Sequence, residues 1–324
     1  PEEQKKRADE YDDVVFNKNY YNSKQSAVKV FMNTFYGEAG NKLSPFFVIE
    51  VAGGITSYGK RNIQFAYTFV KSKGCAVYYG DTDSLYISMP EPVFDEVDRA
   101  YYTGKISKLE YWTKLVEISF KTIKSIQDGV NAAFIADNKT TFLSMAYEEF
   151  LYPVAFTAKK KYFGIAHENI ANFKPKELFI RGLEVKKRGV SDLLKTIFNE
   201  IMWACCDVNN LYDIMELVLG KIDECYTRKW QLRDFIQTGV YKPTKANVKI
   251  NTFVERMKTQ GIDVKPNERF NYVLVKKYPY KYDTRGRKKD ISIGDKIEFV
   301  ETAEKSNMEV DLDYYMQGSV NGQL

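Results

Sequence analysis

The sequence predicts an α+β fold in which helices pack against antiparallel strands. Apolar residues recur at the helical period of 3.6 over residues 54–73 and again over 109–135. Between these helices the period changes to two, because Leu85, Ile87 and Met89 alternate with two other residues. The 324 residues, 44% of them hydrophobic, are enough for two or three packed units.

The N-terminal region predicts two helices joined by a turn. Residues 1–22 are rich in charge, and the run 17–23 (NKNYYNS) favours a turn before a helical pattern that begins near Lys24. On the second helix we expect one face to pack and another to present donors, with a helix end at Gly37. The packing face holds Val28, Phe31 and Phe35, and the donor face holds Lys29, Asn33 and Tyr36.

A β-hairpin with two aspartates at its tip is predicted over residues 76–89. Its turn is the run Gly80-Asp81-Thr82-Asp83-Ser84. Two carboxylates about 4 Å apart repel by roughly 4 kcal/mol at an effective dielectric of 20, so a cation or water must relieve them. Both a solvated Asp-rich turn and a metal site for nucleotidyl transfer explain this pair.

The later part of the chain predicts strands and then helices. Strands are expected within 142–180, and helices over 193–206 and 211–226. The run 159–162 (KKKY) follows an apolar strand pattern, so its lysines are expected to point to alternate sides of a sheet. Such lysines can neutralise DNA phosphates and reach the minor groove, and a solvated strand end is the alternative.

The cysteine and histidine pattern excludes a zinc site built from these residues. Cys75, Cys205, Cys206 and Cys225 have no C-x-x-C spacing, and His167 is the only histidine. A bound metal would therefore take oxygen ligands, which suit hard cations such as Mg²⁺.

The charge is nearly balanced overall but clustered along the chain. Lys and Arg number 48 against 43 Asp and Glu, which gives a net charge of +5. Basic residues gather at 159–161, 186–188 and 285–289, a patchiness typical of surfaces that track phosphates, although each cluster alone also suits a solvated loop.

No run of eighteen or more apolar residues is present, and the N-terminus at Pro1 has neither a Met nor an apolar signal region. We therefore expect a soluble intracellular protein that is cut from a longer one.

Three motifs occur in order along the chain: K-x-x-x-N-x-x-Y-G over 29–37, Y-G-D-T-D-S over 79–84 and K-K-K-Y over 159–162. In this order they resemble the family B DNA-dependent DNA polymerases. The sequence of residues 30–41 is similar to that of polymerases from large double-stranded DNA viruses.

The resemblance implies the right-hand polymerase architecture. Residues 1–40 would form the end of the fingers, and 41–190 a palm with an antiparallel sheet and packed helices. Residues 191–324 would form a mainly helical thumb, truncated at its C-terminus.

The activity implied is template-directed DNA synthesis, in which a primer 3′-hydroxyl attacks the α-phosphate of a dNTP with the help of two Mg²⁺ ions, or Mn²⁺ in their place. The implied partners are primer-template DNA and dNTP, with a sliding clamp or processivity factor as a further candidate and no membrane. A nuclear location and a cytoplasmic viral replication site both stay open.

The resemblance also implies roles for single residues. Asp83 would be the catalytic aspartate that ligates the metal ions, with Asp81 as its nearby partner and Glu148 as a further candidate ligand. The incoming nucleotide would meet Lys29, Asn33, Tyr36 and Gly37. The candidate DNA contacts are Lys159, Lys160, Lys161, Tyr162, Lys186, Lys187 and Arg188.

Two departures from the family pattern leave alternatives. The upstream D-x-x-S-L-Y-P motif with the first catalytic aspartate has no counterpart, so a catalytically incomplete DNA-binding fragment is one alternative. The run 185–189 (VKKRG) keeps the charge of the family's R-R-D run but lacks its acid. A glycosyltransferase with a D-x-D metal site would explain the two aspartates but neither basic motif.

Overall fold

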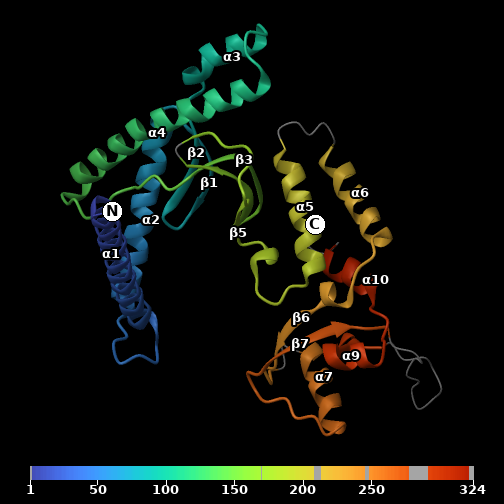
Figure 1. Ribbon diagram of the computed structural model, residues 1–324. Helices are drawn as coiled ribbons and strands as arrows, with labels where there is room; N and C mark the ends of the chain where they lie inside the picture. Colours follow the sequence, from blue (N-terminus) through green and yellow to red (C-terminus); the bar gives the residue numbers. More distant parts are fainter. Residues whose placement is uncertain (1, 169, 208–212, 245–247, 277–290, 321–324) are drawn as a thin grey trace. The chain divides into compact units, whose positions relative to one another are not determined.

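The computed structural model describes residues 2–168, 170–207, 213–244, 248–276 and 291–320 (Figure 1). These residues form two compact units, 1–148 and 149–324. Each unit mixes helices with antiparallel strands, which confirms the predicted α+β fold. No helix within the described ranges is long and apolar enough to cross a membrane.

Unit 1 consists of a β-hairpin packed between long helices. Its elements are α1 (Glu2–Gly40), α2 (Ile49–Ser72), β1 (Ala76–Asp81), β2 (Ser84–Ser88), the short 3-10 helix η1 (Glu91–Phe94), α3 (Asp95–Tyr102) and α4 (Lys108–Asn138). Its core joins α2, the hairpin and α4: Ala66, Val70, Cys75, Met89, Ile126, Val130 and Phe134 are buried together. Burial of these apolar side chains fixes the hairpin against the two helices.

Polar contacts tie the middle of α2 to the last turn of α4. Arg61 pairs with Asp137 at 2.7 Å, and Tyr58 donates to Asn138 Oδ1 at 2.6 Å. Asn138 in turn donates to Asn62, which is buried, at 3.2 Å. These bonds orient α4 across α2, because each joins side chains more than seventy positions apart in the chain.

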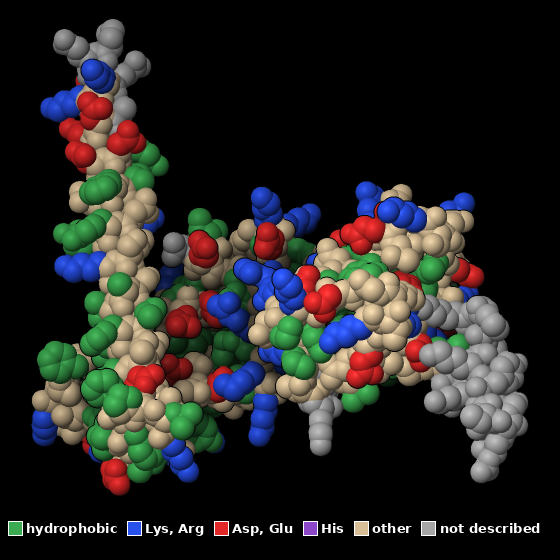
Figure 2. All heavy atoms as spheres, turned by 90° about the horizontal axis from the view of Figure 1, so that it is seen from below, with side chains coloured by type: hydrophobic (Ala, Val, Ile, Leu, Met, Phe, Trp, Pro, Cys, Tyr) green, Lys and Arg blue, Asp and Glu red, His purple; other side chains and the backbone are tan. Residues whose placement is uncertain are grey.

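Helix α1 differs from the prediction in three respects. It runs unbroken through residues 17–23, where a turn was expected, and passes Gly37 to end at Gly40. Asn and Ser cost a helix only a few tenths of a kcal/mol each, and no Pro or Gly interrupts residues 2–36. The expected packing face is also exposed, with Val28 at 52%, Phe31 at 72% and Phe35 at 57%. Figure 2 shows hydrophobic side chains along α1.

Unit 2 contains two small antiparallel sheets and the helices that cover them. Its first part holds β3 (Phe150–Ala158), β4 (Lys161–His167), β5 (Phe179–Arg181), the 3-10 turn η2 (Glu184–Lys186), α5 (Asp192–Cys206) and α6 (Ile214–Thr227). Its second part holds η3 (Leu232–Phe235), β6 (Gln237–Val240), α7 (Val248–Thr259), β7 (Arg269–Leu274), α8 (Ile293–Lys296), β8 (Ile297–Phe299), α9 (Val300–Lys305), α10 (Leu312–Tyr314) and the π-helical turn η4 (Tyr315–Val320). The strand orders are β3-β4-β5 and β6-β7-β8.

The largest core of unit 2 surrounds the sheet β6-β7-β8. Phe253, Leu193, Val273 and Tyr315 are fully buried in it. Tyr315 also makes polar contacts there: its hydroxyl donates to Phe235 O at 2.7 Å and accepts from Leu274 N at 3.2 Å. A smaller core packs β4 against α5.

Most elements agree with the sequence predictions to within a few residues. The helix predicted over 109–135 is α4, and the hairpin over 76–89 is β1 and β2. The strand region begins only at Phe150, and residues 143–149 belong to none of the described strands. The basic cluster at 285–289 and the start of the helix predicted over 211–226 lie outside the described residues.

Candidate active site and nucleic-acid interface

The acidic tip of the β1–β2 hairpin is a tight turn held by local hydrogen bonds. Asp81 and Ser84 pair across the two strands, and Thr82 between them has a positive φ of 51°. Asp83 N donates to Asp81 O at 2.5 Å, and Ser84 Oγ donates to the same oxygen at 3.1 Å. Thr82 Oγ1 donates to Asp81 Oδ1 at 3.1 Å. The turn therefore fixes two carboxylates at neighbouring positions of one hairpin tip.

The chemistry of the tip suits a hard cation. Asp81 is half-buried and Asp83 is exposed, and both offer carboxylate oxygens, which Mg²⁺ prefers. Within the described part of the chain, no group of three or more His, Cys, Asp or Glu side chains is assembled that could hold a metal ion. A cation at this tip would find two carboxylates there and would need further oxygen ligands from elsewhere.

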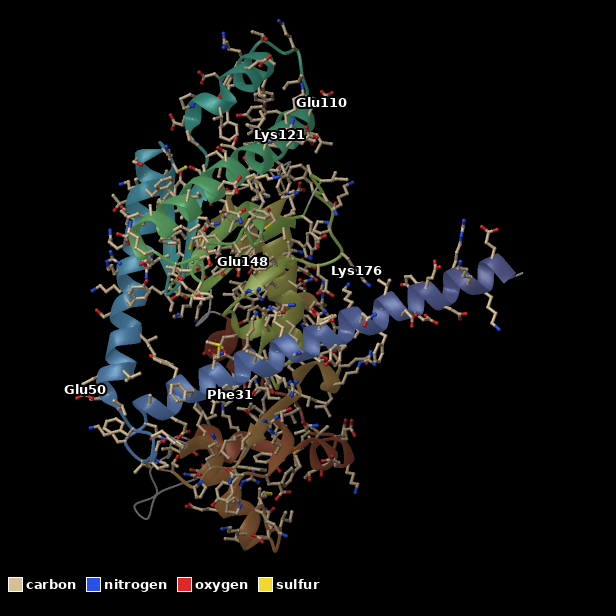
Figure 3. All side chains as sticks on the ribbon, turned by 90° about the vertical axis from the view of Figure 1, so that its left-hand side faces the viewer. Phe31, Glu50, Glu110, Lys121, Glu148 and Lys176 are labelled. Atoms are coloured by element: carbon tan, nitrogen blue, oxygen red, sulfur yellow. The ribbon has the colours of Figure 1, made fainter. Side chains whose placement is uncertain are left out.

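Glu148, the third candidate ligand, is exposed at the end of an extended segment along α4. Asn131 of α4 holds that segment through Met145: Asn131 Oδ1 accepts from Met145 N at 2.7 Å, and its Nδ2 donates to Met145 O at 3.0 Å. Gln127 Nε2 donates to the same oxygen at 3.3 Å. Figure 3 labels Glu148. Sequence reasoning missed Asn131, because no motif signals a bond between positions fourteen apart.

The motif on α1 lies on an exposed helix face. Lys29, Asn33 and Tyr36 are four and three residues apart, so they lie on one side of α1, and all three are exposed. Gly37 lies on the same helix with open space around its Cα. Helix α2 contacts both α1 and β1, and it is the element that links the motif to the acidic hairpin. Figure 3 shows α1 and α2 diverging from the loop that joins them.

The three lysines were expected along one strand. They lie instead at a hairpin tip. Ala158 pairs with Lys161, so Lys159 and Lys160 form a two-residue turn between β3 and β4. Lys160, the second residue of the turn, has a positive φ of 62°, whereas Lys159 does not have a positive φ. The apolar strand pattern ends at the turn, and the period of two cannot reveal where a strand reverses. The tip therefore gathers the lysines instead of dividing them between two faces.

Tyr162 follows the tip on β4, and its ring contacts Phe156 of β3 at a centroid distance of 5.4 Å. The second basic run lies in and after η2, where Lys186, Lys187 and Arg188 are all exposed. Lys187 is paired with Glu184 at 2.6 Å, so part of its charge is compensated locally.

His167 is a structural histidine. It is 1% exposed, and its Nδ1 accepts from Asn172 N at 2.9 Å. Its Nε2 must then carry the proton, and it lies 2.7 Å from Tyr152 O, to which it donates. Burial lowers the pKa of this imidazole, which keeps it neutral.

Lys29 and Asp83 lie in unit 1 and Lys160 lies in unit 2. In a polymerase palm these three residues would border one cleft. That arrangement stays a prediction, as do the role of each site residue and the boundaries 1–40, 41–190 and 191–324.

Comparison with known proteins identifies the family. The model of DNA polymerase family B matches residues 2–108 and 112–324. The chain is 39% identical over 336 residues to a DNA polymerase beta of African swine fever virus, covering 96% of the chain and 28% of that protein. It is 24% identical to a DNA polymerase of Pyramimonas orientalis virus, with coverage of 95% and 24%. The chain belongs to DNA polymerase family B.

A solved structure supports the fold. The family B DNA polymerase of Pyrobaculum calidifontis superposes with a TM-score of 0.55 at 18% identity, covering 92% of the chain and 32% of that protein. The chain thus spans about a quarter to a third of the length of these relatives. Family membership confirms the predicted resemblance, including its likeness to viral polymerases.

Proposed function

We propose that the chain is part of an enzyme that synthesises DNA on a template, adding dNMP from a dNTP to a primer 3′-hydroxyl. The observation that carries the proposal is the tight hairpin tip with Asp81 and Asp83, in a chain that family B covers almost completely. The exposed motif face of α1 and the lysine tip of β3–β4 supply the further chemistry that a nucleotide and a duplex need.

Asp83 and Asp81 would hold divalent metal, two Mg²⁺ ions or Mn²⁺, with Glu148 as a further candidate. When bound, such ions lower the cost of the negative charge that builds up on the reacting phosphate. Lys29 would bind the triphosphate as a point charge, and Asn33, Tyr36 and Gly37 would border the incoming nucleotide.

The partners proposed are primer-template DNA and dNTP, with a sliding clamp or processivity factor as a further candidate. The lysines at 159–161 and the basic residues at 186–188 would contact the sugar-phosphate backbone, which carries no sequence information and suits an enzyme that copies any template. An intracellular location is proposed for the same reason, since DNA and dNTP are intracellular.

A second candidate function applies to the 324 residues taken alone: duplex binding without catalysis. One observation favours it: the sequence has no counterpart of the D-x-x-S-L-Y-P motif, in which the family carries its first catalytic aspartate. On this proposal the isolated chain binds duplex with a steep salt dependence and does not extend a primer.

The test is the substitution Asp83→Ala in a full-length polymerase that carries this sequence, with Glu96→Ala, an exposed acid of α3, as the matched control. We expect Asp83→Ala to abolish primer extension with Mg²⁺ and to leave duplex binding nearly unchanged, because the side chain serves the reacting groups and not the backbone contacts. The control should extend normally. Normal extension by the Asp83→Ala enzyme would refute the assignment.

The incomplete-fragment proposal has its own test. The 324-residue chain is mixed with labelled primer-template, dNTP and Mg²⁺, and binding and extension are followed in the same reaction. Binding without extension is expected, and primer extension by the chain alone would contradict this second candidate.

A further inference from the structure

The sheet β3-β4-β5 has one covered face and one open face within unit 2. Its cross-strand pairs alternate in character, because neighbouring positions of a strand point to opposite faces. The row Ala155–Phe163–Ile180 faces α5, and Phe163 is 6% exposed in the core shared with that helix. Figure 1 shows this sheet and α5 within unit 2.

The next row, on the other face, is aromatic and basic. Phe156 of β3 pairs with Tyr162 of β4, and Tyr162 pairs with Arg181 of β5. Phe179, two residues before Arg181, lies on the same face. The covering elements of unit 2 pack on the opposite side, where the buried partners of α5 lie.

Ring contacts run across all three strands of the open face. Phe156 and Tyr162 lie 5.4 Å apart, and Tyr162 stacks on Phe179 at 6.2 Å with an interplanar angle of 27°. The guanidinium of Arg181 lies over the Phe179 ring, 4.4 Å from its centroid. Cation–π contact at this distance restrains a side chain that is otherwise exposed.

The backbone also fixes Arg181 beside the lysine tip. Gly182 has a φ of +67°, and a Cβ on it would collide with the carbonyl oxygen of Lys160. The end of β5 therefore lies against the turn of β3–β4 at backbone contact distance, which only glycine permits. Arg181 is held next to the basic run of Lys159 and Lys161.

The charge of Arg181 is not paired with an acidic side chain among the described residues of unit 2. Among the described residues, no hydrogen bond or ion pair is formed by its guanidinium, in contrast to Lys187, which pairs with Glu184. A restrained, uncompensated guanidinium beside the lysines of the tip complements a row of phosphates, and its planar fork suits bidentate contact with one of them.

We propose that the open face of β3-β4-β5 binds the sugar-phosphate backbone of duplex DNA through Arg181, a further phosphate contact, and that Phe179 positions its guanidinium. The inference rests on the proposed function and extends its DNA interface from the lysine tip to strand β5. Arg181 would touch a phosphate, whereas Phe179 would act only through Arg181.

The experiment measures primer-template binding by the 324-residue chain at several salt concentrations. Arg181→Met is compared with Arg269→Met, which removes an exposed arginine from the other sheet of unit 2. Loss of one phosphate contact should make the slope of log K against log salt shallower by about one unit and weaken binding about tenfold at 0.1 M salt. The control should keep the slope and affinity of the unaltered chain.

The positioning role has a separate readout. Arg181→Lys and Phe179→Leu keep the charge, so each should retain the salt slope while affinity falls by a few fold. Phe179→Leu added to Arg181→Met should weaken binding no further than Arg181→Met alone, because the ring acts through the guanidinium. Thermal unfolding midpoints equal to that of the unaltered chain establish that the variants are folded.

The possible outcomes distinguish failure of the inference from failure of the proposed function. A steep salt slope for the unaltered chain with an unchanged slope for Arg181→Met overturns the phosphate contact and leaves the proposed function standing. Additive losses for the two substitutions overturn the positioning role of Phe179. An unaltered chain that does not bind duplex at all overturns both the inference and the proposed DNA-binding role of this chain.

Discussion

At the scale of single residues, Lys160 combines a charge that is proposed to contact DNA with a backbone conformation that its side chain disfavours. Its φ of 62° lies in the left-handed region, where a non-glycine residue costs on the order of 1 kcal/mol. Its neighbours Lys159 and Lys161 have no such constraint. The charge and the conformation can therefore be separated by one substitution.

We predict that Lys160→Gly weakens primer-template binding without lowering stability. Glycine adopts the positive φ at no steric cost, while removal of the ammonium should reduce the salt slope of duplex binding by about one unit. The measurements are binding over a salt series and urea unfolding of the same protein. A variant that keeps the full slope would count against the proposed contact, and one that loses stability would count against the conformational argument.

Tyr272 should make the stability of the folded chain depend on pH in the alkaline range. Burial raises the pKa of Tyr272 from 10 to about 12, with a smaller contribution from Tyr314 nearby. Since the neutral phenol is favoured in the folded state, its contribution to stability is complete below pH 10 and is lost as the pH rises towards 12.

The prediction is that the urea midpoint of unfolding falls between pH 10 and 12 and that Tyr272→Phe makes this fall smaller. Tyr315 is a second source of the same effect, because burial raises its pKa as well. The Phe variant should therefore reduce the pH dependence without removing it. Identical pH profiles for Tyr272→Phe and the unaltered chain would contradict the prediction.

At the scale of elements, the sequence predicts correctly where the apolar period and the turn residues agree. The β1–β2 hairpin has alternation in its strands and a Gly-Asp-Thr-Asp turn, and both are local signals. Helix α4 likewise has an amphipathic pattern, and Ser107 and Glu110 form its capping box. These elements need no distant part of the chain to specify them.

The failed predictions share a physical cause. Residues that are typical of turns allow a turn to form but do not determine whether the chain turns there. Residues 17–23 of α1 can form a turn, yet the helix continues because its many other residues favour it. Lys159 and Lys160 show the reverse case, since two lysines form a turn without Gly, Asn or Asp. In the site, motifs reveal which residue types occur, but side-chain contacts such as Arg181 on Phe179 arise only from strand pairing.

Helix α4 supports the extended segment that carries Glu148. Asn131 bonds both the N–H and the C=O of Met145, as a neighbouring strand would do. We predict that Asn131→Ala increases hydrogen exchange of the Met145 amide by at least tenfold, since its acceptor is removed. Asp128→Ala, an exposed position one turn earlier on α4, is the matched control and should leave that amide unchanged.

If the candidate role of Glu148 is correct, Asn131→Ala should also reduce primer extension by a full-length polymerase while duplex binding is kept. An unchanged amide exchange rate would show that the clamp does not hold the segment. Faster exchange with normal extension would instead argue against a role for Glu148.

At the scale of the whole molecule, the two compact units have separate cores. The core of unit 1 is built from α2, β1, β2 and α4, and the largest core of unit 2 surrounds β7 and β8. The described basic runs proposed to contact DNA lie in unit 2, whereas the acidic hairpin tip lies in unit 1. A modest net charge of +5 is therefore compatible with local basic runs in the part of the chain that is proposed to bind DNA.

Separate cores predict that a defect in one core acts mainly on its own unit, and Tyr315→Phe tests this. The substitution removes a hydroxyl that bonds Phe235 O and Leu274 N inside unit 2, which should cost about 1–3 kcal/mol of unfolding free energy. Hydrogen exchange should then accelerate at the amides of η3 and β7 and stay unchanged in α2 and α4. Tyr314→Phe, at the neighbouring and more exposed ring, is the matched control and should accelerate neither set. Equal acceleration in both units after Tyr315→Phe would mean that the cores unfold as one cooperative structure, and the assignment of the DNA contacts and the acidic tip to independently stable units would have to be abandoned.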